Sequence, residues 1–269
     1  MARNDGLNLS TGKWVTFVDA DDWIEENYIN SLYANADKLT DMVIGRTIAV
    51  KNNIELYDGY RGHKIENFTG ENKERLFESI FNDNIKNMKY PHISTCSAKL
   101  IRKDIIVKNK LSYNTKLKYY EDALFNIETI CLSRNVKVID KVIYKYRLNV
   151  NSSTHSFDDN TLLYYKQVYL ELNKLSKKYN LNFKKYNDIF RIKNLDSILI
   201  NYLRNTKQKF CKKIEFISKL KENKIYSSAI KKVKISELTK RRKVLVALYR
   251  IRLYIIIYLF YNYIIKQDM

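Results

Sequence analysis

Residues 2–23 of the 269-residue chain read ARNDGLNLSTGKWVTFVDADDW, and they are the most informative part of the sequence. Residues 14–18 form an apolar run of β-branched and aromatic side chains, and the acidic residues Asp19 and Asp21 follow it directly. Such a run predicts a short buried strand. Open α/β sheets bind ligands beyond the carboxyl ends of their strands, so the sequence places two carboxylates where a substrate would bind.

The two aspartates are candidate metal ligands. If the strand geometry continued through Asp19 and Asp21, the pleat would aim both carboxylates to one side, close enough to share a divalent cation. An Asp-x-Asp triplet by itself is most often a solvated turn or a helix cap. Here the motif ARNDGL precedes the apolar run and Trp23 follows the acids, and this context favours a site over a plain turn.

The segment resembles the donor-binding core of family 2 glycosyltransferases, enzymes of the GT-A fold that transfer a sugar from a nucleotide diphosphate sugar to an acceptor hydroxyl. The resemblance implies that Asp19 contacts the donor and that Asp21 holds Mg²⁺ or Mn²⁺ against its diphosphate. It also implies that Arg3 and Asn4 help to shape the donor pocket. A bound cation would stabilise the negative charge on the departing nucleoside diphosphate.

The resemblance also predicts a gap at the amino terminus. Members of the family begin with two or three βα units that bind the base and the ribose, and no such sequence precedes Ala2. We therefore expect an α/β, Rossmann-like GT-A domain that lacks its first βα units. The start could lie upstream, the gene could be split or decayed, or a separate polypeptide could supply the missing half; the sequence leaves all three open.

A second motif, KYYEDALF, occupies residues 118–125. It resembles the family's Glu-Asp signature, which implies that Asp122 is the general base of an inverting transfer and takes the proton of the acceptor hydroxyl. Glu121 would orient that hydroxyl or Asp122 itself. Without the resemblance, a Glu-Asp pair at the start of a helix is most often a favourable first-turn charge on the helix dipole.

The segment VIYKYRLNVNSSTHS (residues 142–156) contains a third, weaker motif. Family members often have a Tyr-Arg pair followed by a serine-rich loop that closes on the donor diphosphate. Arg147 offers a forked donor for phosphate oxygens, and Ser152 and Ser153 offer hydroxyl donors. His155 is a candidate phosphate or metal contact, with a plain loop histidine as the open alternative.

Apolar periodicity predicts the elements between these motifs. We expect helices over residues 25–38 and 73–82, a strand over residues 41–50, a hairpin and loop over residues 51–71, and helices from residue 160 onward. The tract TCSAKLIRKDII (residues 95–106) resembles the family's strand-to-helix segment, and a plain structural turn is the open alternative.

Charge is unevenly distributed along the chain. The net charge is +20, and residues 201–269 hold 18 lysines and arginines against four acidic residues. The three cysteines are an odd number without C-x-x-C spacing, which argues against a disulfide framework and a zinc site and favours a reducing compartment. A nearly balanced domain followed by a basic region suggests two roles, although lysine-rich helices can also be solvated faces.

The apolar, tyrosine-rich run VLVALYRIRLYIIIYLFYNYII spans residues 244–265, directly after a KRRK tetrapeptide. Its uninterrupted part, residues 253–260, is much shorter than the ~20 residues that a transmembrane helix needs. The pattern favours an interfacial helix, with Arg250 and Arg252 snorkelling and the basic run facing anionic lipid. A C-terminal helix packed on the domain is the open alternative.

These observations predict a partial GT-A catalytic domain over residues 1–155 and a basic helical region over residues 156–269. The expected reaction is inverting transfer from a UDP-linked sugar to a saccharide or lipid-linked acceptor, in bacterial surface polysaccharide or glycolipid synthesis. The expected location is the cytoplasmic face of the plasma membrane, as a peripheral protein. An inactive fragment or a partner subunit of a split glycosyltransferase is the alternative. A nucleic-acid partner is disfavoured, because the basic charge adjoins an apolar segment and no recognised nucleic-acid motif is present.

Overall fold

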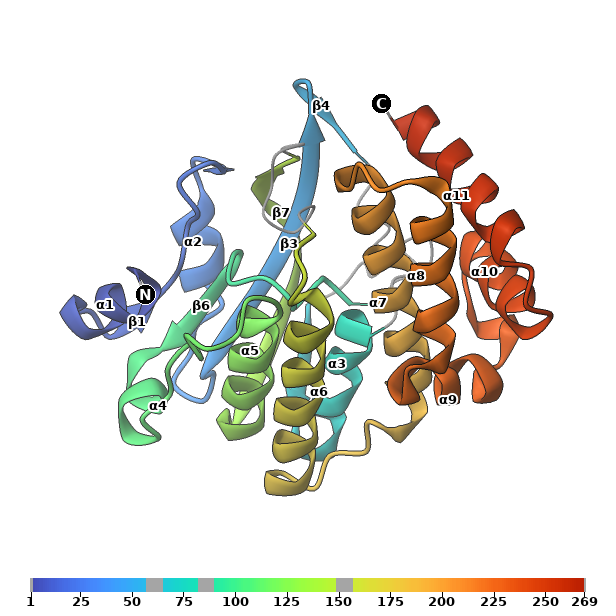
Figure 1. The fold of residues 1–269 in the computed structure, drawn as a ribbon. Coiled ribbons are helices and arrows are strands. Elements are labelled where there is room, and N and C mark those ends of the chain that lie inside the picture. The colour runs from blue at the N-terminus through green and yellow to red at the C-terminus, as the bar shows by residue number, and fades with distance from the viewer. Residues whose placement is uncertain (1, 57–64, 82–89, 149–156, 269) are drawn as a thin grey trace. The chain divides into compact units, whose positions relative to one another are not determined.

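The computed structural model describes residues 2–56, 65–81, 90–148 and 157–268. The chain divides into two compact units, coloured along the sequence in Figure 1. The first comprises Met1–Asn149 and Gln167–Leu181, and the second comprises Val150–Lys166 and Asn182–Met269. The assignment of catalysis to residues 1–155 and of a separate role to residues 156–269 stays a prediction.

The first unit is built on a mixed sheet with the strand order β1-β6-β3-β7-β2. In addition, β4 pairs with β3 and β5 pairs with β7. The two long central strands, β3 and β7, run parallel, and the other pairs are antiparallel. The strands are β1 (Trp14–Val15), β2 (Trp23–Ile24), β3 (Met42–Lys51), β4 (Ile54–Glu55), β5 (Glu66–Thr69), β6 (Lys99–Arg102) and β7 (Asn135–Arg147).

Helices cover this sheet. They are α1 (Ala2–Leu9), α2 (Tyr28–Tyr33), the 3₁₀ turn η1 (Gly70–Lys73), α3 (Glu74–Phe81), α4 (Lys103–Lys108), α5 (Glu121–Leu132) and α6 (Thr161–Lys178), whose C-terminal part belongs to this unit. Tyr28 and Leu32 of α2 pack in one core cluster with Val43, Ile143 and Tyr144 of the central strands. Burial of this apolar surface is the main stabilising contribution to the unit.

Gly45 allows β3 and β7 to approach each other closely. A Cβ atom at this position would lie 2.4 Å from Cδ1 of Ile143 on β7. The pairing register of the two strands shifts on both sides of Arg46, which marks an irregularity in the ladder. Glycines in strand interiors commonly mark such close approaches.

Several predicted elements are confirmed, with small shifts at their ends. The strand over 41–50 is β3, the helix over 73–82 is α3, and the tract 95–106 forms β6 and then α4. The expected hairpin is the β3–β4 connection, whose two turn residues, Asn52 and Asn53, both have positive φ. This is the backbone that two-residue hairpin turns of type I′ require.

Two predicted elements are shorter than expected. The strand predicted over residues 14–18 ends at Val15, and Val18 is 48% exposed. The chain leaves the sheet and turns instead, with the Asp22 N–H donating to the Asp19 carbonyl. The helix predicted over 25–38 covers only Tyr28–Tyr33. After it the chain tightens into turns, since the Asn35 and Ala36 N–H groups donate to carbonyls three residues back. Asp37 then accepts backbone hydrogen bonds from Leu39 and Thr40 and forms a further turn.

The second unit is helical in the part of the chain that the structure describes. Its elements, besides the start of α6, are α7 (Lys184–Asn205), α8 (Phe210–Glu222), α9 (Lys224–Lys232), the 3₁₀ turn η4 (Ile235–Glu237), α10 (Lys240–Arg250) and α11 (Tyr254–Asp268). The single helix expected over the apolar run is divided into α10 and α11, since Arg252 between them adopts φ 61°. Among the described residues, no helix is both long enough and apolar enough to cross a membrane.

Candidate functional site

Arg3 joins the two acidic motifs at one point. Its Nη2 donates to Asp19 Oδ1 and its Nη1 to Asp122 Oδ1, both at 2.8 Å, and Nη1 also lies 3.6 Å from Glu121 Oε1. The side chains of Arg3 and Asp19 are about one-third exposed, and that of Asp122 is 16% exposed. A single guanidinium thus faces three carboxylates in a partly desolvated site, where charge-assisted hydrogen bonds are strong.

Asp122 lies in the first turn of α5. This helix begins directly after Tyr120, whose backbone adopts the left-handed conformation with φ 62°. Burial raises the pKa of Asp122 to about 6; Arg3 opposes the increase, whereas the charges of Glu121 and Asp19 add to it. The Cys96 N–H donates to the other carboxylate oxygen at 3.3 Å. A pKa close to the working pH is what a general base needs.

A tight turn over residues 95–98 presents Cys96 to Asp122. The buried Lys99 of β6 donates from Nζ to the carbonyls of Thr95 (2.7 Å) and Ser97 (2.9 Å), and Ala98 adopts φ 55°. From α5, one turn after Asp122, Asn126 Nδ2 also donates to the Thr95 carbonyl. Burial lowers the pKa of Lys99 to about 8. Sequence reasoning missed these supports, and the available signal was a lysine within an apolar strand.

The turn that carries Asp21 is held by β7. The Tyr144 hydroxyl accepts from the Asp19 N–H at 3.0 Å and donates to Asp22 Oδ2 at 2.7 Å. Arg147 donates from Nε to the Asp21 carbonyl and from its backbone N–H to Asp22 Oδ1, both at 2.8 Å. The structure therefore brings the predicted Arg147 to the predicted Asp21. Sequence reasoning did not identify Tyr144 or Asp22 as part of this site.

The carboxylates fit a metal held jointly with substrate. Within the described ranges there is no group of three or more His, Cys, Asp or Glu residues that could hold a metal ion. Mg²⁺ is, however, usually bound through one or two carboxylates together with substrate phosphates. Asp21 is exposed and could supply such a carboxylate. The argument from a continuing pleat was wrong, because the strand ends before Asp19. Ser152, Ser153 and His155 lie outside the described residues.

Asn4 positions α1. Its side-chain amide donates to the Tyr113 carbonyl at 2.9 Å and accepts from the Tyr113 N–H at 2.8 Å. The Tyr113 ring stacks on Phe125 of α5, with ring centroids 4.2 Å apart, and Arg3 lies over the same ring. Asn4 therefore fixes the helix that carries Arg3, and its predicted contact with the donor stays a prediction.

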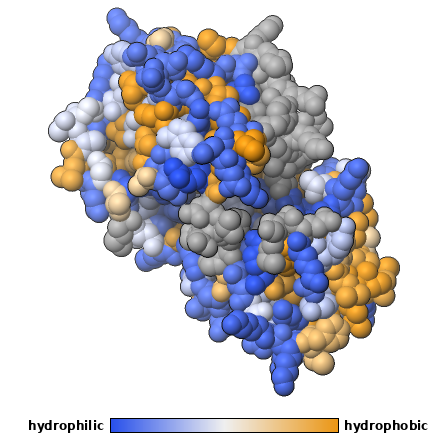
Figure 2. Space-filling view, turned by 90° about the horizontal axis from the view of Figure 1, so that it is seen from above, coloured by the Kyte–Doolittle hydropathy of each residue, from blue (hydrophilic) through white to orange (hydrophobic). Residues whose placement is uncertain are grey.

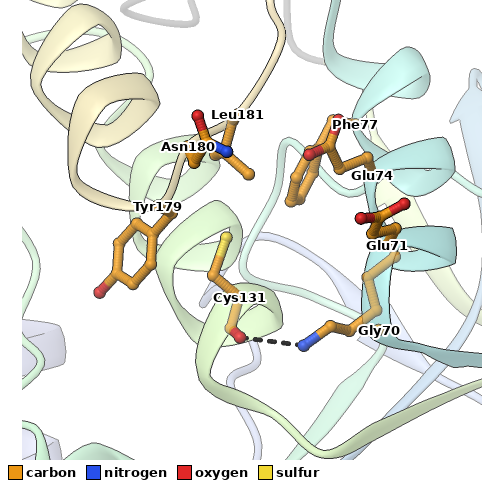
Figure 3. Close-up of a pocket in the computed structure, with 9 residues that line it drawn as sticks. Gly70, Glu71, Glu74, Phe77, Cys131, Tyr179, Asn180 and Leu181 are labelled. Atoms are coloured by element: carbon orange, nitrogen blue, oxygen red, sulfur yellow. Dashed lines mark hydrogen bonds between the residues drawn. The ribbon is translucent and has the colours of Figure 1, made fainter.

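Two cavities border α1 and α5. A cavity of about 760 Å³ between α1 and the β1–β2 segment is lined by Arg3 and Asp19. A second, of about 520 Å³, adjoins the C-terminal end of α5, where Cys131 points toward Phe77 and Leu181 (Figure 3). Twelve helical residues span about 18 Å, so this second cavity is remote from Asp122 and contains none of the predicted site residues.

Comparison with known proteins agrees with this geometry. Residues 1–107 match the sequence model described as glycosyl transferase family 2. This part of the chain therefore carries the sequence pattern of that family. The α/β fold with a mostly helical C-terminal region is confirmed by its likeness to solved structures. The structure of S. aureus TarS 1–349 in complex with UDP-GlcNAc matches with a TM-score of 0.53 and 17% identity, over 92% of this chain and 66% of that one. At this identity the likeness concerns the fold alone.

Curated glycosyltransferases match more than half of the chain. The putative glycosyltransferase EpsH of Bacillus subtilis is 25% identical over 155 residues, which cover 56% of this chain and 42% of EpsH. The poly(ribitol-phosphate) beta-N-acetylglucosaminyltransferase TarP of Staphylococcus aureus is 29% identical over 160 residues, which cover 57% of this chain and 43% of TarP. The matches thus span less than half the length of these two relatives.

Proposed function

We propose that this chain carries out inverting transfer of a sugar from a UDP-linked donor to an acceptor hydroxyl. The observation that carries the proposal is the bridge from Arg3 to both Asp19 and Asp122. It joins the Asp-x-Asp segment, which the resemblance assigns to the donor, to the carboxylate that it assigns to proton transfer. The proposed donor-binding segment and the proposed general base therefore lie side by side in the first unit.

Asp122 acts as the general base in this proposal. The acceptor oxygen attacks the anomeric carbon as the bond from that carbon to the diphosphate oxygen breaks, and the bonding electrons leave with the nucleoside diphosphate. The Asp122 carboxylate takes the acceptor proton. With its pKa near 6, the group is mainly ionised at neutral pH, and it is still basic enough to accept a proton.

Asp21 and Arg147 serve the donor side. A divalent cation, Mg²⁺ or Mn²⁺, would offset the charge that develops on the leaving diphosphate, and Asp21 is the residue that we assign to hold it. The Arg147 guanidinium, exposed beside the Asp21 turn, is placed to bind phosphate oxygens. The TarS complex contains UDP-GlcNAc, which supports a UDP-linked hexose or N-acetylhexosamine as the donor.

The acceptor is a saccharide or a lipid-linked saccharide, in bacterial surface polysaccharide or glycolipid synthesis. The named substrate of TarP, poly(ribitol-phosphate), supports a surface polymer as the acceptor class. The acceptor hydroxyl would enter beside Asp122, with Glu121 in the same helical turn able to orient it.

The test is release of UDP from UDP-GlcNAc by the 269-residue chain with Mg²⁺ or Mn²⁺ and an oligosaccharide acceptor. Asp122→Asn should lower turnover by about 10²- to 10⁴-fold, and Asp21→Ala should abolish the response to added metal. Asp104→Asn, an exposed carboxylate of α4, is the matched control. Wild-type turnover by Asp122→Asn would overturn the assignment of the base. Turnover that required a second polypeptide would support the partner-subunit alternative.

A further inference from the structure

Helix α11 presents an exposed apolar stripe. Ile255, Ile256, Leu259 and Tyr263 are between 45% and 61% exposed, although all four belong to the most apolar segment of the chain. They are spaced as one face of a helix. Hydrophobic side chains gather in patches on the surface drawn in Figure 2, rather than being spread evenly. A contiguous apolar stripe of this kind marks an interaction site more often than scattered exposed residues do.

The rotation of α11 about its axis is fixed from inside the second unit. Ile257, Tyr261 and Ile265 are buried on the opposite side of the helix. The Tyr261 hydroxyl donates to the fully buried Asp196 of α7. The same carboxylate accepts from Arg241 and Arg242 of α10, so α7, α10 and α11 are tied together. At about 100° per residue, this contact turns Leu259 and Tyr263 outward.

Positive charge brackets the stripe. Arg252 and Lys266 are exposed at its two ends. Lys266 lies on the same helical face as the stripe, and Arg252 lies in the turn that precedes α11. Arg252 and Lys231 both lie near Lys221, and their positive charges add to the effect of burial in lowering the pKa of Lys221. Residues 238–267 contain seven lysines and arginines and no acidic residue. An apolar stripe that ends in cations matches the chemistry of an anionic lipid surface, whose acyl boundary takes the apolar side chains while the headgroups pair with the cations.

We propose that this stripe, with Arg252 and Lys266, docks the protein on an anionic lipid surface such as the cytoplasmic leaflet of a plasma membrane. The helix lies in the plane of the interface, since its Tyr261 side stays packed in the second unit. Arg241 and Arg242 of the KRRK segment contribute little to lipid binding, because they are already engaged by Asp196. This narrows the sequence-based expectation, which had the whole basic run face the lipid. The proposal is independent of the transfer reaction.

The experiment is co-sedimentation of the 269-residue chain with phosphatidylglycerol vesicles and with phosphatidylcholine vesicles. We expect preferential binding to phosphatidylglycerol that weakens as salt is raised. Leu259→Asp should reduce the partition coefficient by about tenfold or more, as expected for removing a large apolar side chain from the contact. The matched control is Leu163→Asp on α6, where the parent leucine is 49% exposed. It should bind like the parent chain.

A second measurement does not depend on the stability of the aspartate variant. Tyr263→Trp should show a blue shift and quenching by brominated acyl chains on phosphatidylglycerol vesicles, whereas Leu163→Trp should show neither. Arg252→Gln combined with Lys266→Gln should reduce the preference for anionic lipid.

Three results would overturn the proposal. One is unchanged vesicle binding by Leu259→Asp together with no quenching of Tyr263→Trp. Another is a dimer in sedimentation velocity that Leu259→Asp dissociates, without vesicle binding, which would assign the stripe to a second copy of the chain. The third is tight, salt-sensitive binding of duplex DNA without vesicle binding, which would assign the charge to nucleic acid.

Discussion

The guanidinium of Arg3 lies 2.8 Å from the carboxylate of Asp122, although 119 positions separate them in the sequence. The contact sets α1 against the start of α5 and places a positive charge beside a carboxylate that burial would otherwise push further toward its neutral form. The protonation of the proposed base therefore depends on a residue from the other end of the first unit.

Arg3→Gln should shift the pH dependence of transfer. Arg3 lowers the pKa of Asp122, so its removal should raise that pKa above about 6. The ionised base is then lost at higher pH, and the acid limb of kcat/KM should move upward by roughly one pH unit. Lys174→Gln removes the same charge from an exposed pair with Glu171 and should leave the profile unchanged. An acid limb that stays in place in Arg3→Gln would show that Arg3 does not tune the base.

Asp122 should also make stability depend on pH. Its pKa rises from 3.8 to about 6 on folding, so its stabilising contribution is complete below about pH 4 and is lost as the pH rises through 6. The shift corresponds to up to about 3 kcal/mol. In urea unfolding, the free energy of unfolding of Asp122→Asn should therefore rise relative to that of wild type as the pH increases from 4 to 7. The exposed Asp104→Asn variant should show no such trend. If the free energy of unfolding of Asp122→Asn differed from that of wild type by the same amount at every pH, the raised pKa of Asp122 would be contradicted.

Lys99→Met tests whether the turn over residues 95–98 positions the base. The substitution keeps the apolar stem and removes the donors to the Thr95 and Ser97 carbonyls. The Thr95 carbonyl keeps its hydrogen bond from Asn126, whereas the Ser97 carbonyl loses the Lys99 donor. An unsatisfied buried acceptor costs about 1–3 kcal/mol, so the turn should loosen and kcat should fall by about tenfold or more. Hydrogen exchange of the Cys96 amide should accelerate, since this N–H is the donor to Asp122. The exposed Lys108→Met on α4 is the control, and unchanged exchange at Cys96 would refute the positioning role.

Gly45→Ala should destabilise the first unit by about 1–3 kcal/mol, because the new methyl group would meet Ile143 at 2.4 Å. The cause can be checked with a double-mutant cycle in urea unfolding. Ile143→Ala removes the atoms that clash, so Gly45→Ala should cost much less in that background. Equal costs in both backgrounds would mean that the strain lies in the backbone.

Elements with their own apolar periodicity could be predicted from the sequence. The long strand β3 and the helix α3 are examples, and their predicted ends differ from the observed ones by one residue. Helix α1 could not be predicted in this way. It contains Gly6, buries only Leu7, and is held by contacts of Arg3 and Asn4 with residues more than a hundred positions away. Such contacts leave no local pattern.

The break between α10 and α11 could not be predicted from the sequence either, since neither glycine nor proline marks it. Arg250 ends α10 by donating to the carbonyls of Ile230 and Val233 in the neighbouring segment. A lysine, Lys221, donates to the carbonyl of Tyr249 in the last turn of the same helix. The end of this helix is therefore set by side chains from elsewhere in the second unit, a tertiary effect that overrides the local pattern.

At the site, the motifs predicted which residues are involved but not how they are connected. The structure brings Arg3, Asp19, Glu121 and Asp122 together and places Arg147 on the Asp21 turn. Their catalytic and donor-binding roles stay predictions. The supports Lys99 and Tyr144 lie within the quoted segments 95–106 and 142–156. The motifs assigned neither of them a role, because a residue that orients another leaves no spacing rule in the sequence.

Asp196 carries a consequence for genetics. It is fully buried, yet its contact with Tyr261 determines which side chains of α11 face outward. A genetic selection for variants that no longer bind the lipid surface should therefore recover substitutions at Asp196, although this residue itself does not contact lipid. Such alleles would look like folding defects in a denaturation experiment and like targeting defects in a cell. Charge reversal at Arg252 or Lys266 should instead give the targeting phenotype alone.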